Sequence, residues 1–376
     1  MLLYVHIPFC VAKCRYCAFA SEAMTVDTLT AWEKAFAAEA AHYGRLLNRP
    51  TIETVYLGGG TSSLLPARSF ERLAETLARH FVISSGIEFT IEANPDSVTD
   101  ADLARLWRKS GVNRVSLGVQ SLCDAELSRL GRPHDAAQAA TAVALLRDAG
   151  FANLSLDLIW GLPGQSLASW MDTLRTAVAL GPEHISMYGL TLEEGTPLAA
   201  DVEHGVRALP EEEEAARMYL DGGEFLESRG YAQYEISNFA RVGLACRHNQ
   251  GYWEGRDYLG LGPSAVSTVA GRRWKNPAAV AQYAKLAGTL AWGGDAQRLT
   301  DAVFGKERLM LALRTARGLD LDMYRRVMGR DMRDAHAPFV RTLCEKGLGR
   351  MTENTFTLTR QGMLVSNGII GRLVFD

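Results

Sequence analysis

The chain has 376 residues, of which 47% are hydrophobic and 22% charged, and its formal net charge is −3. This length predicts one large domain with one or two smaller ones, and the composition is ordinary for a globular protein. The small negative charge argues against a dedicated nucleic-acid binder, because little counterion release would drive such binding.

Short β-branched apolar runs alternate with helical patterns through the first half of the chain. We predict strands at Leu2–Ile7, Thr54–Leu57, Glu88–Ala93, Arg114–Val119, Leu154–Ile159 and His184–Leu190. Helical patterns lie between them, at Thr28–Leu47, Ala67–His80, Asp100–Ser110, Ala136–Ala149 and Ser166–Leu180. Such β–α repetition indicates an α/β fold with a parallel sheet and right-handed crossovers. Six units are too few for a closed eight-stranded barrel, so we predict a partial (β/α)6 barrel over residues 1–200.

The alternation stops after residue 190, which predicts a change of architecture. A helix with an acidic first turn is expected at Glu211–Arg229, within a connector over residues 201–300 that is rich in glycine and aromatic residues. Residues 301–376 predict two helices and a hairpin at Gly349–Leu358, which resembles a small winged-helix domain. Such domains often bind DNA, but the basic excess here is too mild to favour a nucleic-acid partner.

The start of the chain predicts a cytoplasmic location. Its apolar beginning, Met1–His6, is too short for a signal peptide and carries no basic leader. No run of about twenty apolar residues follows anywhere, so we expect no membrane-spanning segment.

Polar residues fall repeatedly at the carboxyl ends of the predicted strands. They are Cys10, Gly58–Thr61, Glu92, Gln120, Asp157 and Tyr188. The carboxyl ends of parallel strands share one rim, and barrel-like α/β folds build their active sites there. The pattern therefore predicts a functional site on this rim.

Three of the six cysteines crowd into one loop directly after the first strand. Cys10, Cys14 and Cys17 have the spacing Cys-x3-Cys-x2-Cys, whereas Cys123, Cys246 and Cys344 stand alone. In a chain without a leader, this pattern indicates a metal or cluster site and not disulfides. Structural zinc normally takes four ligands, so a zinc loop would need His6 or Cys246 as the fourth. Three thiolates instead leave one metal position open for chemistry.

The segment Tyr4–Cys17 resembles the signature of the radical S-adenosylmethionine (SAM) superfamily. The resemblance implies a [4Fe–4S] cluster held by Cys10, Cys14 and Cys17. Its open iron would chelate the amino and carboxylate groups of SAM, and reduction would release a 5′-deoxyadenosyl radical. The aromatic residue before the third cysteine, Tyr16, is expected near the adenine.

Further motifs resemble the oxygen-independent coproporphyrinogen III oxidase family across nearly the whole chain. They include Gly58–Ser62, Glu92–Pro95, Gly118–Ser121, Asp157–Pro163 and Leu261–Ala265. By this resemblance, the residues that contact SAM are Tyr4, Tyr16, Gly59, Gly60, Thr61, Glu92, Gln120, Arg132 and Asp157. Glu92 would pair with the SAM ammonium, and Arg132 would bind the SAM carboxylate in bidentate fashion.

Two departures from the oxidase pattern point to a related subfamily of heme chaperones. The oxidase has a fourth cysteine where this chain has Phe19, and it has an extension before the first strand, which begins here at Leu2. This subfamily also carries an HNxxYW motif, present here at His248–Trp253. The resemblance implies heme binding and transfer to respiratory proteins, without oxidase activity. It also suggests a homodimer, a flavodoxin- or ferredoxin-type electron donor and membrane-associated heme recipients.

His248 is the expected heme ligand, because imidazole is a common axial ligand and Tyr252 and Trp253 offer flat apolar faces. Cys246 is a competing thiolate, and a histidine hydrogen-bonded to the barrel is the structural alternative. Cys123 and Cys344 are expected to be buried. Three other functions stay open: oxidative decarboxylation of coproporphyrinogen III to protoporphyrinogen IX, another radical SAM reaction, and a winged-helix regulator with a cluster sensor.

Overall fold

Six parallel strands in chain order form the centre of the molecule. The computed structural model describes residues 1–289 and 292–375. Each strand of the six except the last pairs in parallel with the next along the chain. They are β1 (Leu2–Ile7), β2 (Thr51–Gly59), β3 (Val82–Ala93), β4 (Arg114–Gln120), β5 (Leu154–Trp160) and β6 (His184–Gly189). The predicted α/β fold and all six predicted strands are confirmed.

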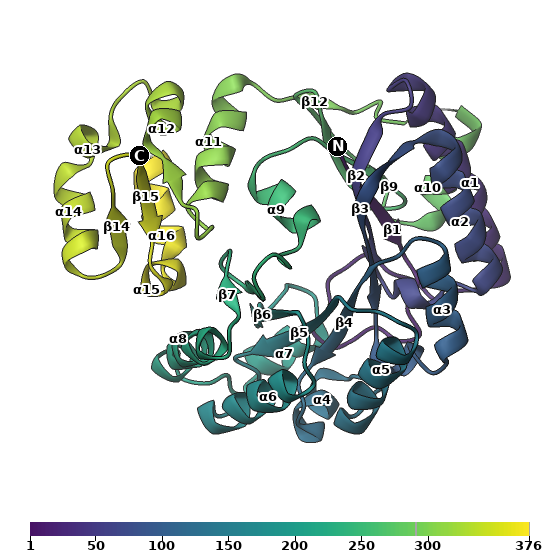
Figure 1. Cartoon of the computed structure of the whole chain (residues 1–376), viewed down its shortest axis with the longest axis horizontal. Coiled ribbons are helices and arrows are strands. Elements are labelled where there is room, and N and C mark those ends of the chain that lie inside the picture. The colour runs from purple at the N-terminus through teal and green to yellow at the C-terminus, as the bar shows by residue number, and fades with distance from the viewer. Residues whose placement is uncertain (290–291, 376) are drawn as a thin grey trace.

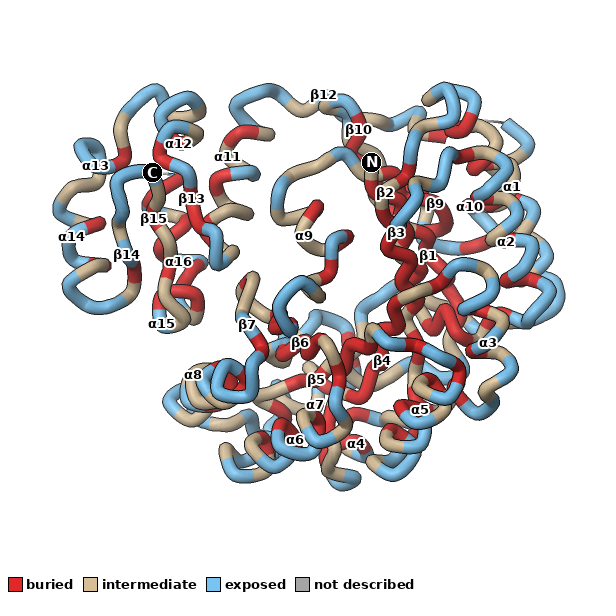
Figure 2. Tube along the Cα trace, in the orientation of Figure 1, coloured by how far each residue is buried: buried red, intermediate tan, exposed pale blue. Residues whose placement is uncertain are grey.

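Helices cover the outer face of this curved sheet (Figure 1). They are α1 (Val26–Leu46), α2 (Ala67–His80), α3 (Ala101–Lys109), α4 (Asp124–Leu130), α5 (Ala136–Asp148) and α6 (Leu167–Ala179). Side-chain caps fix where several begin: Thr25 and Asp135 form capping boxes, and Ser166 accepts a bond from the amide of Ser169. Figure 2 shows the strands buried between these helices and the interior.

The strands of the predicted connector extend both edges of the barrel sheet. The order is β12-β11-β10-β9-β1-β2-β3-β4-β5-β6-β8-β7, with β9 parallel to β1 and β8 antiparallel to β6. The added strands are β7 (Ala232–Gln233), β8 (Asn238–Ala240), β9 (Tyr258–Leu261), β10 (Val266–Val269), β11 (Arg272–Lys275) and β12 (Gln297–Arg298). Part of the segment 201–300 is thus continuous with the barrel sheet. β1 and β6 pair with these added strands and not with each other.

Four further helices belong to the second half of the barrel region. They are α7 (Pro197–Glu203), α8 (Glu212–Ser228), α9 (Arg247–Trp253) and α10 (Val280–Thr289). Figure 1 shows α9, which carries the HNxxYW motif, on the concave side of the sheet, between the barrel strands and the C-terminal helices. No helix among the described residues is long and apolar enough to cross a membrane.

The C-terminal region folds around a small antiparallel sheet of order β13-β15-β14. The predicted hairpin is confirmed as β14 (Gly349–Met351) and β15 (Thr355–Leu358), and β13 (Leu319–Asp320) pairs with the outer side of β15. Its helices are α11 (Asp301–Ala312), α12 (Leu321–Met328), α13 (Met332–Ala335), α14 (Ala337–Glu345), α15 (Arg360–Leu364) and α16 (Ser366–Ile370).

A buried carboxyl group fastens α1 to the loop after β9. Glu39 is fully buried and accepts hydrogen bonds from the Gly262 amide at 2.8 Å, Asn276 Nδ2 at 2.7 Å and the Tyr283 hydroxyl at 2.6 Å. These three hydrogen bonds lower the pKa of Glu39, but burial has the larger effect and raises it to about 7. Gly262 has φ +102°, and a Cβ there would lie 2.4 Å from the His6 carbonyl oxygen, so the loop requires glycine.

The raised pKa of Glu39 predicts a pH dependence of stability. The folded chain holds this proton more tightly than the unfolded chain, so the contribution is full below the ordinary pKa of 4.5 and is lost as pH rises through about 7. We expect Glu39→Gln to flatten the slope of the unfolding free energy across this interval, measured by denaturant titration. Glu75→Gln, on the exposed face of α2, is the matched control. An unchanged slope in Glu39→Gln would contradict the prediction.

Candidate cofactor site

The loop that carries the three cysteines is fixed at both ends by backbone hydrogen bonds. The Glu22 amide donates to the Pro8 carbonyl at 2.7 Å, and the Cys10 amide donates to the Glu22 carbonyl at 3.1 Å. In the middle of the loop, Arg15 forms an ion pair with Asp201 of α7 at 2.7 Å. The backbone amide of Arg15 also donates to the Leu130 carbonyl at the end of α4. The loop is therefore held against α4 and α7.

The thiols of this loop fit a cluster better than a single metal ion. All three are free and partly exposed. Within residues 1–289 and 292–375, no three metal-ligating side chains lie close enough to hold one ion. A [4Fe–4S] cluster binds each thiolate through a different iron, so its sulfurs lie farther apart than around one ion. Burial raises the pKa of Cys17, and Cys14 and Cys10 raise it further, so the three thiols are close enough to interact electrostatically.

The glycine run at the end of β2 passes directly against the start of the cysteine loop. A Cβ on Gly60 would lie 2.5 Å from the Phe9 carbonyl oxygen, and one on Gly59 would lie 2.6 Å from the His6 ring. Gly59 also has φ +114°, in the left-handed region that disfavours side chains. The run therefore needs glycine at Gly59 and Gly60 for its backbone to lie on the rim. The next residue, Thr61, donates to Cys10 Sγ at 3.8 Å.

Glu92 ends β3 beside this glycine run, where it is suited to receive a cation. Its Oε1 accepts the Tyr56 hydroxyl at 2.9 Å, and its Oε2 accepts the Gly59 amide at 3.2 Å. Burial is the largest influence and raises the pKa of Glu92 to about 7. An ammonium group at this carboxylate would favour the ionised form. Tyr56 was not predicted from the sequence.

Arg132 joins the cysteine loop to the ends of two strands. Its Nη1 donates to Cys14 Sγ at 3.3 Å, while Nη2 donates to Asn94 Oδ1 at 2.7 Å and to the Gly118 carbonyl at 2.9 Å. Asn94 in turn donates to Thr61 Oγ1 at 2.9 Å. The Nε atom of Arg132 is buried without a hydrogen-bond partner in the part of the chain that the structure describes. This guanidinium therefore keeps donor capacity for a further acceptor.

Asp157 of β5 is held by hydroxyl groups from three adjacent strands. Its carboxylate accepts hydrogen bonds from Ser116 at 2.9 Å, Ser155 at 3.2 Å and Ser186 at 2.6 Å. Burial nevertheless raises the pKa of Asp157 above its ordinary value. The three hydroxyls fix the orientation of an acceptor that suits ribose or other hydroxyl donors.

The remaining predicted SAM residues lie on the same side of the barrel. The Tyr4 hydroxyl hydrogen-bonds His6 Nδ1 at 3.0 Å, and burial raises the pKa of Tyr4. Tyr16, whose pKa burial also raises, is close to Arg132 and Cys14. Gln120 closes β4 with φ +65°, an uncommon conformation for a residue with a side chain.

His248 faces the barrel interior from α9, and both of its ring nitrogens have partners. Nδ1 hydrogen-bonds Thr54 Oγ1 at 2.8 Å, and Nε2 hydrogen-bonds the Tyr252 hydroxyl at 3.1 Å. The ring stacks on Tyr56 with a centroid distance of 5.1 Å and is 1% exposed. Burial, and then the charge of Arg114, lower the pKa of His248 to about 3, so the imidazole is neutral. The geometry is that of the structural alternative, a histidine hydrogen-bonded to the barrel.

Three expectations about cysteines need correction. Cys246 was predicted as a thiolate, but it is 2% exposed and its thiol donates to Glu88 Oε1 at 3.4 Å. Burial raises the pKa of Cys246 to about 12, so the group is a neutral thiol and not a ready ligand. Cys123 and Cys344 were expected to be buried, whereas both are partly exposed.

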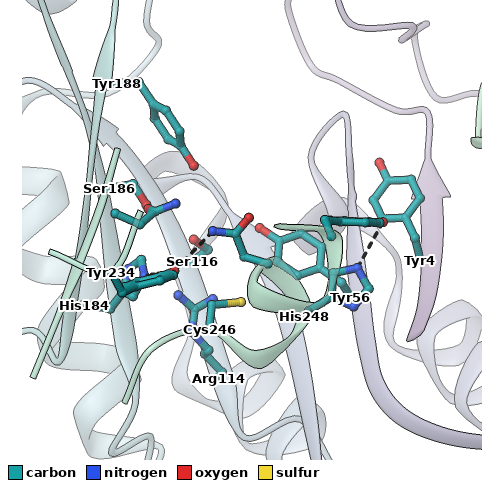
Figure 3. Close-up of a pocket in the computed structure, with 13 residues that line it drawn as sticks. Tyr4, Tyr56, Arg114, Ser116, His184, Ser186, Tyr188, Tyr234, Cys246 and His248 are labelled. Carbon is teal, nitrogen blue, oxygen red and sulfur yellow. Dashed lines mark hydrogen bonds between the residues drawn. The ribbon is translucent and has the colours of Figure 1, made fainter. Parts of the chain in front are cut away.

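Two cavities lie on opposite sides of α9. One, of about 340 Å³, is inside the barrel and is lined by residues that include His248, Asn249 and Tyr252 (Figure 3). The other, of about 370 Å³, lies between α9 and the C-terminal region, where Trp253 and Gln250 meet Arg308, Arg317 and Met323. The motif residues therefore divide between two spaces, since neighbouring helix positions face different directions.

Comparisons with known proteins agree with this geometry. Residues 4–177 match the model of the radical SAM superfamily, and residues 299–365 match the HemN C-terminal domain. The chain is 33% identical to the heme chaperone HemW of Bacillus subtilis (strain 168), over 98% of this chain and 97% of that protein. It is 37% identical to the heme chaperone HemW of Mycobacterium tuberculosis (strain CDC 1551 / Oshkosh), over 85% of this chain and 83% of that one.

Among solved structures, the fold is similar to that of coproporphyrinogen III oxidase (HemN) from Escherichia coli, described as a radical SAM enzyme. The TM-score is 0.82 at 23% identity, and the match covers 99% of this chain and 89% of the other. This likeness shows that the two chains share a fold.

The cysteine loop predicts a cluster that depends on each of its three thiols. We expect Cys14→Ala to lose the cluster after anaerobic reconstitution, because Cys10 and Cys17 alone leave two irons without protein ligands. Iron and sulfide content and visible absorption measure the loss. Cys344→Ala, in α14, is the control and should retain the cluster. A full cluster in Cys14→Ala would place the ligands elsewhere.

The position of Glu92 predicts a pH-dependent affinity for SAM. The pKa of about 7 means that the carboxylate loses its charge as pH falls through that value, and with it the attraction to an ammonium group. We expect SAM to bind more weakly below this pH. Glu92→Gln should bind SAM about tenfold more weakly or worse at higher pH and should lose most of the pH dependence. Equal affinities of wild type and variant, from equilibrium titration, would contradict this role.

Proposed function

The chain belongs to the radical SAM superfamily, in the family of the heme chaperone HemW, and we propose from this premise that it binds heme and transfers it to heme-dependent respiratory proteins. The observation that carries the proposal is the similarity to HemW of Bacillus subtilis over nearly the full length of both chains. The match spans the cysteine loop, the HNxxYW helix and the C-terminal region together.

In this proposal the barrel keeps a [4Fe–4S] cluster and SAM. Cys10, Cys14 and Cys17 would hold the cluster, which leaves one iron free to chelate SAM and supplies the electron for its reductive cleavage. The residues of this chain bind and orient the SAM groups. Glu92 would receive the ammonium, Arg132 the carboxylate and Asp157 the ribose hydroxyls. Tyr4, Tyr16, Gly59, Gly60, Thr61 and Gln120 would complete the walls of this site.

The absence of a fourth cysteine supports a chaperone over an oxidase. Phe19 occupies that place and is 67% exposed beside the cluster loop. An exposed apolar side chain there, with Val11 at 71%, offers a contact for a flavodoxin- or ferredoxin-type reductant. We also propose that such a protein donates the electron and that the chain forms a homodimer. We propose a cytoplasmic location, because a reducing compartment would keep the three thiols free for the cluster.

His248 is the proposed heme ligand, and the structure defines what ligation would require. Iron at Nε2 would replace the hydrogen bond to Tyr252, while the hydrogen bond from Nδ1–H to Thr54 Oγ1 would keep the ring in place. The imidazole is already neutral, so no proton has to leave before it binds a metal. Tyr252 would have to turn aside to admit the macrocycle.

The test is a heme titration of the anaerobically reconstituted protein, followed by Soret absorption. We expect stoichiometric binding by wild type and at least tenfold weaker binding by His248→Ala, with cluster content unchanged. His204→Ala, at the exposed end of α7, is the matched control and should bind like wild type.

Two results would overturn parts of this proposal separately. Wild-type affinity in His248→Ala would remove the ligand assignment and leave the chaperone. No heme binding by wild type, together with formation of protoporphyrinogen IX from coproporphyrinogen III, SAM and reductant, would replace the chaperone by the oxidase.

A further inference from the structure

The buried side chain of Arg114 has no hydrogen-bond partner among the described residues. Arg114 begins β4, is 2% exposed, and lines the 340 Å³ cavity inside the barrel (Figure 3). Its side chain forms no hydrogen bond or ion pair with residues 1–289 or 292–375, and its Nε is fully buried. Buried guanidinium groups are normally paired or hydrogen-bonded, because desolvation of an unpaired charge is costly. Nearby groups, Glu88 among them, offset its desolvation and keep the pKa of Arg114 high, but no described residue accepts a hydrogen bond from its side chain.

The carboxylates around Arg114 are already engaged by other donors. Glu88 accepts the Cys246 thiol and the backbone amides of Arg247 and His248. Glu92 and Asp157, which Arg114 influences electrostatically, are bound respectively by Tyr56 with Gly59 and by three serine hydroxyls. Each is therefore oriented by other groups and not by the guanidinium. The hydrogen-bonding edge of Arg114 faces the cavity.

Aromatic rings form much of the remaining wall. Tyr56, Tyr188, Tyr234 and Tyr252 line it together with the ring of His184. His184 is held by Ser155 and Tyr234, at 2.8 Å and 2.9 Å, and burial, followed by the charge of Arg114, lowers its pKa. His248 is neutral for the same reasons. The cavity thus presents one positive charge among neutral aromatic groups.

We propose that this cavity binds a small aromatic carboxylate, whose carboxylate group pairs with the Arg114 guanidinium. A planar carboxylate matches the fork of arginine donors. A phosphate dianion would require a second cation, whereas Glu92 and Asp157 lie nearby instead. With Tyr252 in its present position, the volume suits one ring with a short side chain, and a tetrapyrrole would need Tyr252 to turn aside. His248 lines the same cavity, so heme bound there and this carboxylate would compete for the space. The SAM carboxylate has its own partner in Arg132.

The test uses 3-phenylpropionate and its uncharged amide, 3-phenylpropanamide, as probes of the reconstituted protein with SAM bound. Isothermal titration should give at least tenfold tighter binding of the carboxylate than of the amide to wild type. Arg114→Met should bind both probes with similar, weak affinity. Arg350→Met, an exposed position on β14, is the control and should behave like wild type.

Three outcomes would overturn the proposal. Equal affinities of wild type for the acid and the amide would show that no cation recognises the carboxylate, and this comparison needs no variant. Equally tight binding of the acid to wild type and Arg114→Met, with the variant folded by circular dichroism, would place it elsewhere. Displacement of SAM by the probe would place it in the SAM site. If Arg114→Met does not fold, Arg114→Lys replaces it, with weakened but still selective binding expected; loss of selectivity in that variant would also contradict the proposal.

Discussion

The hydrogen bonds of Arg132 are the interactions on which the site geometry most depends. One guanidinium contacts the Cys14 sulfur, the Asn94 side chain and the Gly118 carbonyl, and so joins a loop to the ends of β3 and β4. Asn94 in turn donates a hydrogen bond to Thr61, which donates to the Cys10 sulfur. Because a charged donor makes stronger hydrogen bonds than a neutral one, this group can hold a glycine-rich rim together. The position of the cysteine loop is therefore set by side chains that also face the proposed SAM site.

The central fold was predictable because each buried strand has a strong local pattern. β1 and α2 have the predicted bounds, and the other central strands differ mainly at their ends. β3 begins at Val82, earlier than predicted, because its first residues are largely exposed and Ser84–Gly86 interrupt the apolar pattern. β7 and β12 have two residues each and are fixed by their partners, β8 and β11, to which they pair antiparallel. Such strands have no periodicity from which to predict them.

The residues of the candidate site that belong to sequence motifs were predictable, whereas the contacts that depend on tertiary packing were not. Strand-end motifs located the polar rim, because parallel strands bring their carboxyl ends together. Arg114 was missed, since a basic residue at the start of a strand normally reaches solvent. The environment of His248 was equally hidden, because its partner Thr54 lies 194 residues away in sequence. The neutral state of Cys246 follows from its burial at the start of α9, which no spacing of cysteines reveals.

The short helix α9, of about two turns, separates two cavities, and this has a mechanical consequence. His248, Asn249 and Tyr252 border the interior, while Gln250 and Trp253 border the groove beside the C-terminal region. If α9 shifts as a rigid body toward one cavity, that cavity becomes smaller and the other becomes larger. A ligand that displaces α9 from one cavity must therefore change the volume of the other cavity. The coupling between ligands in the two cavities is reciprocal by thermodynamic necessity.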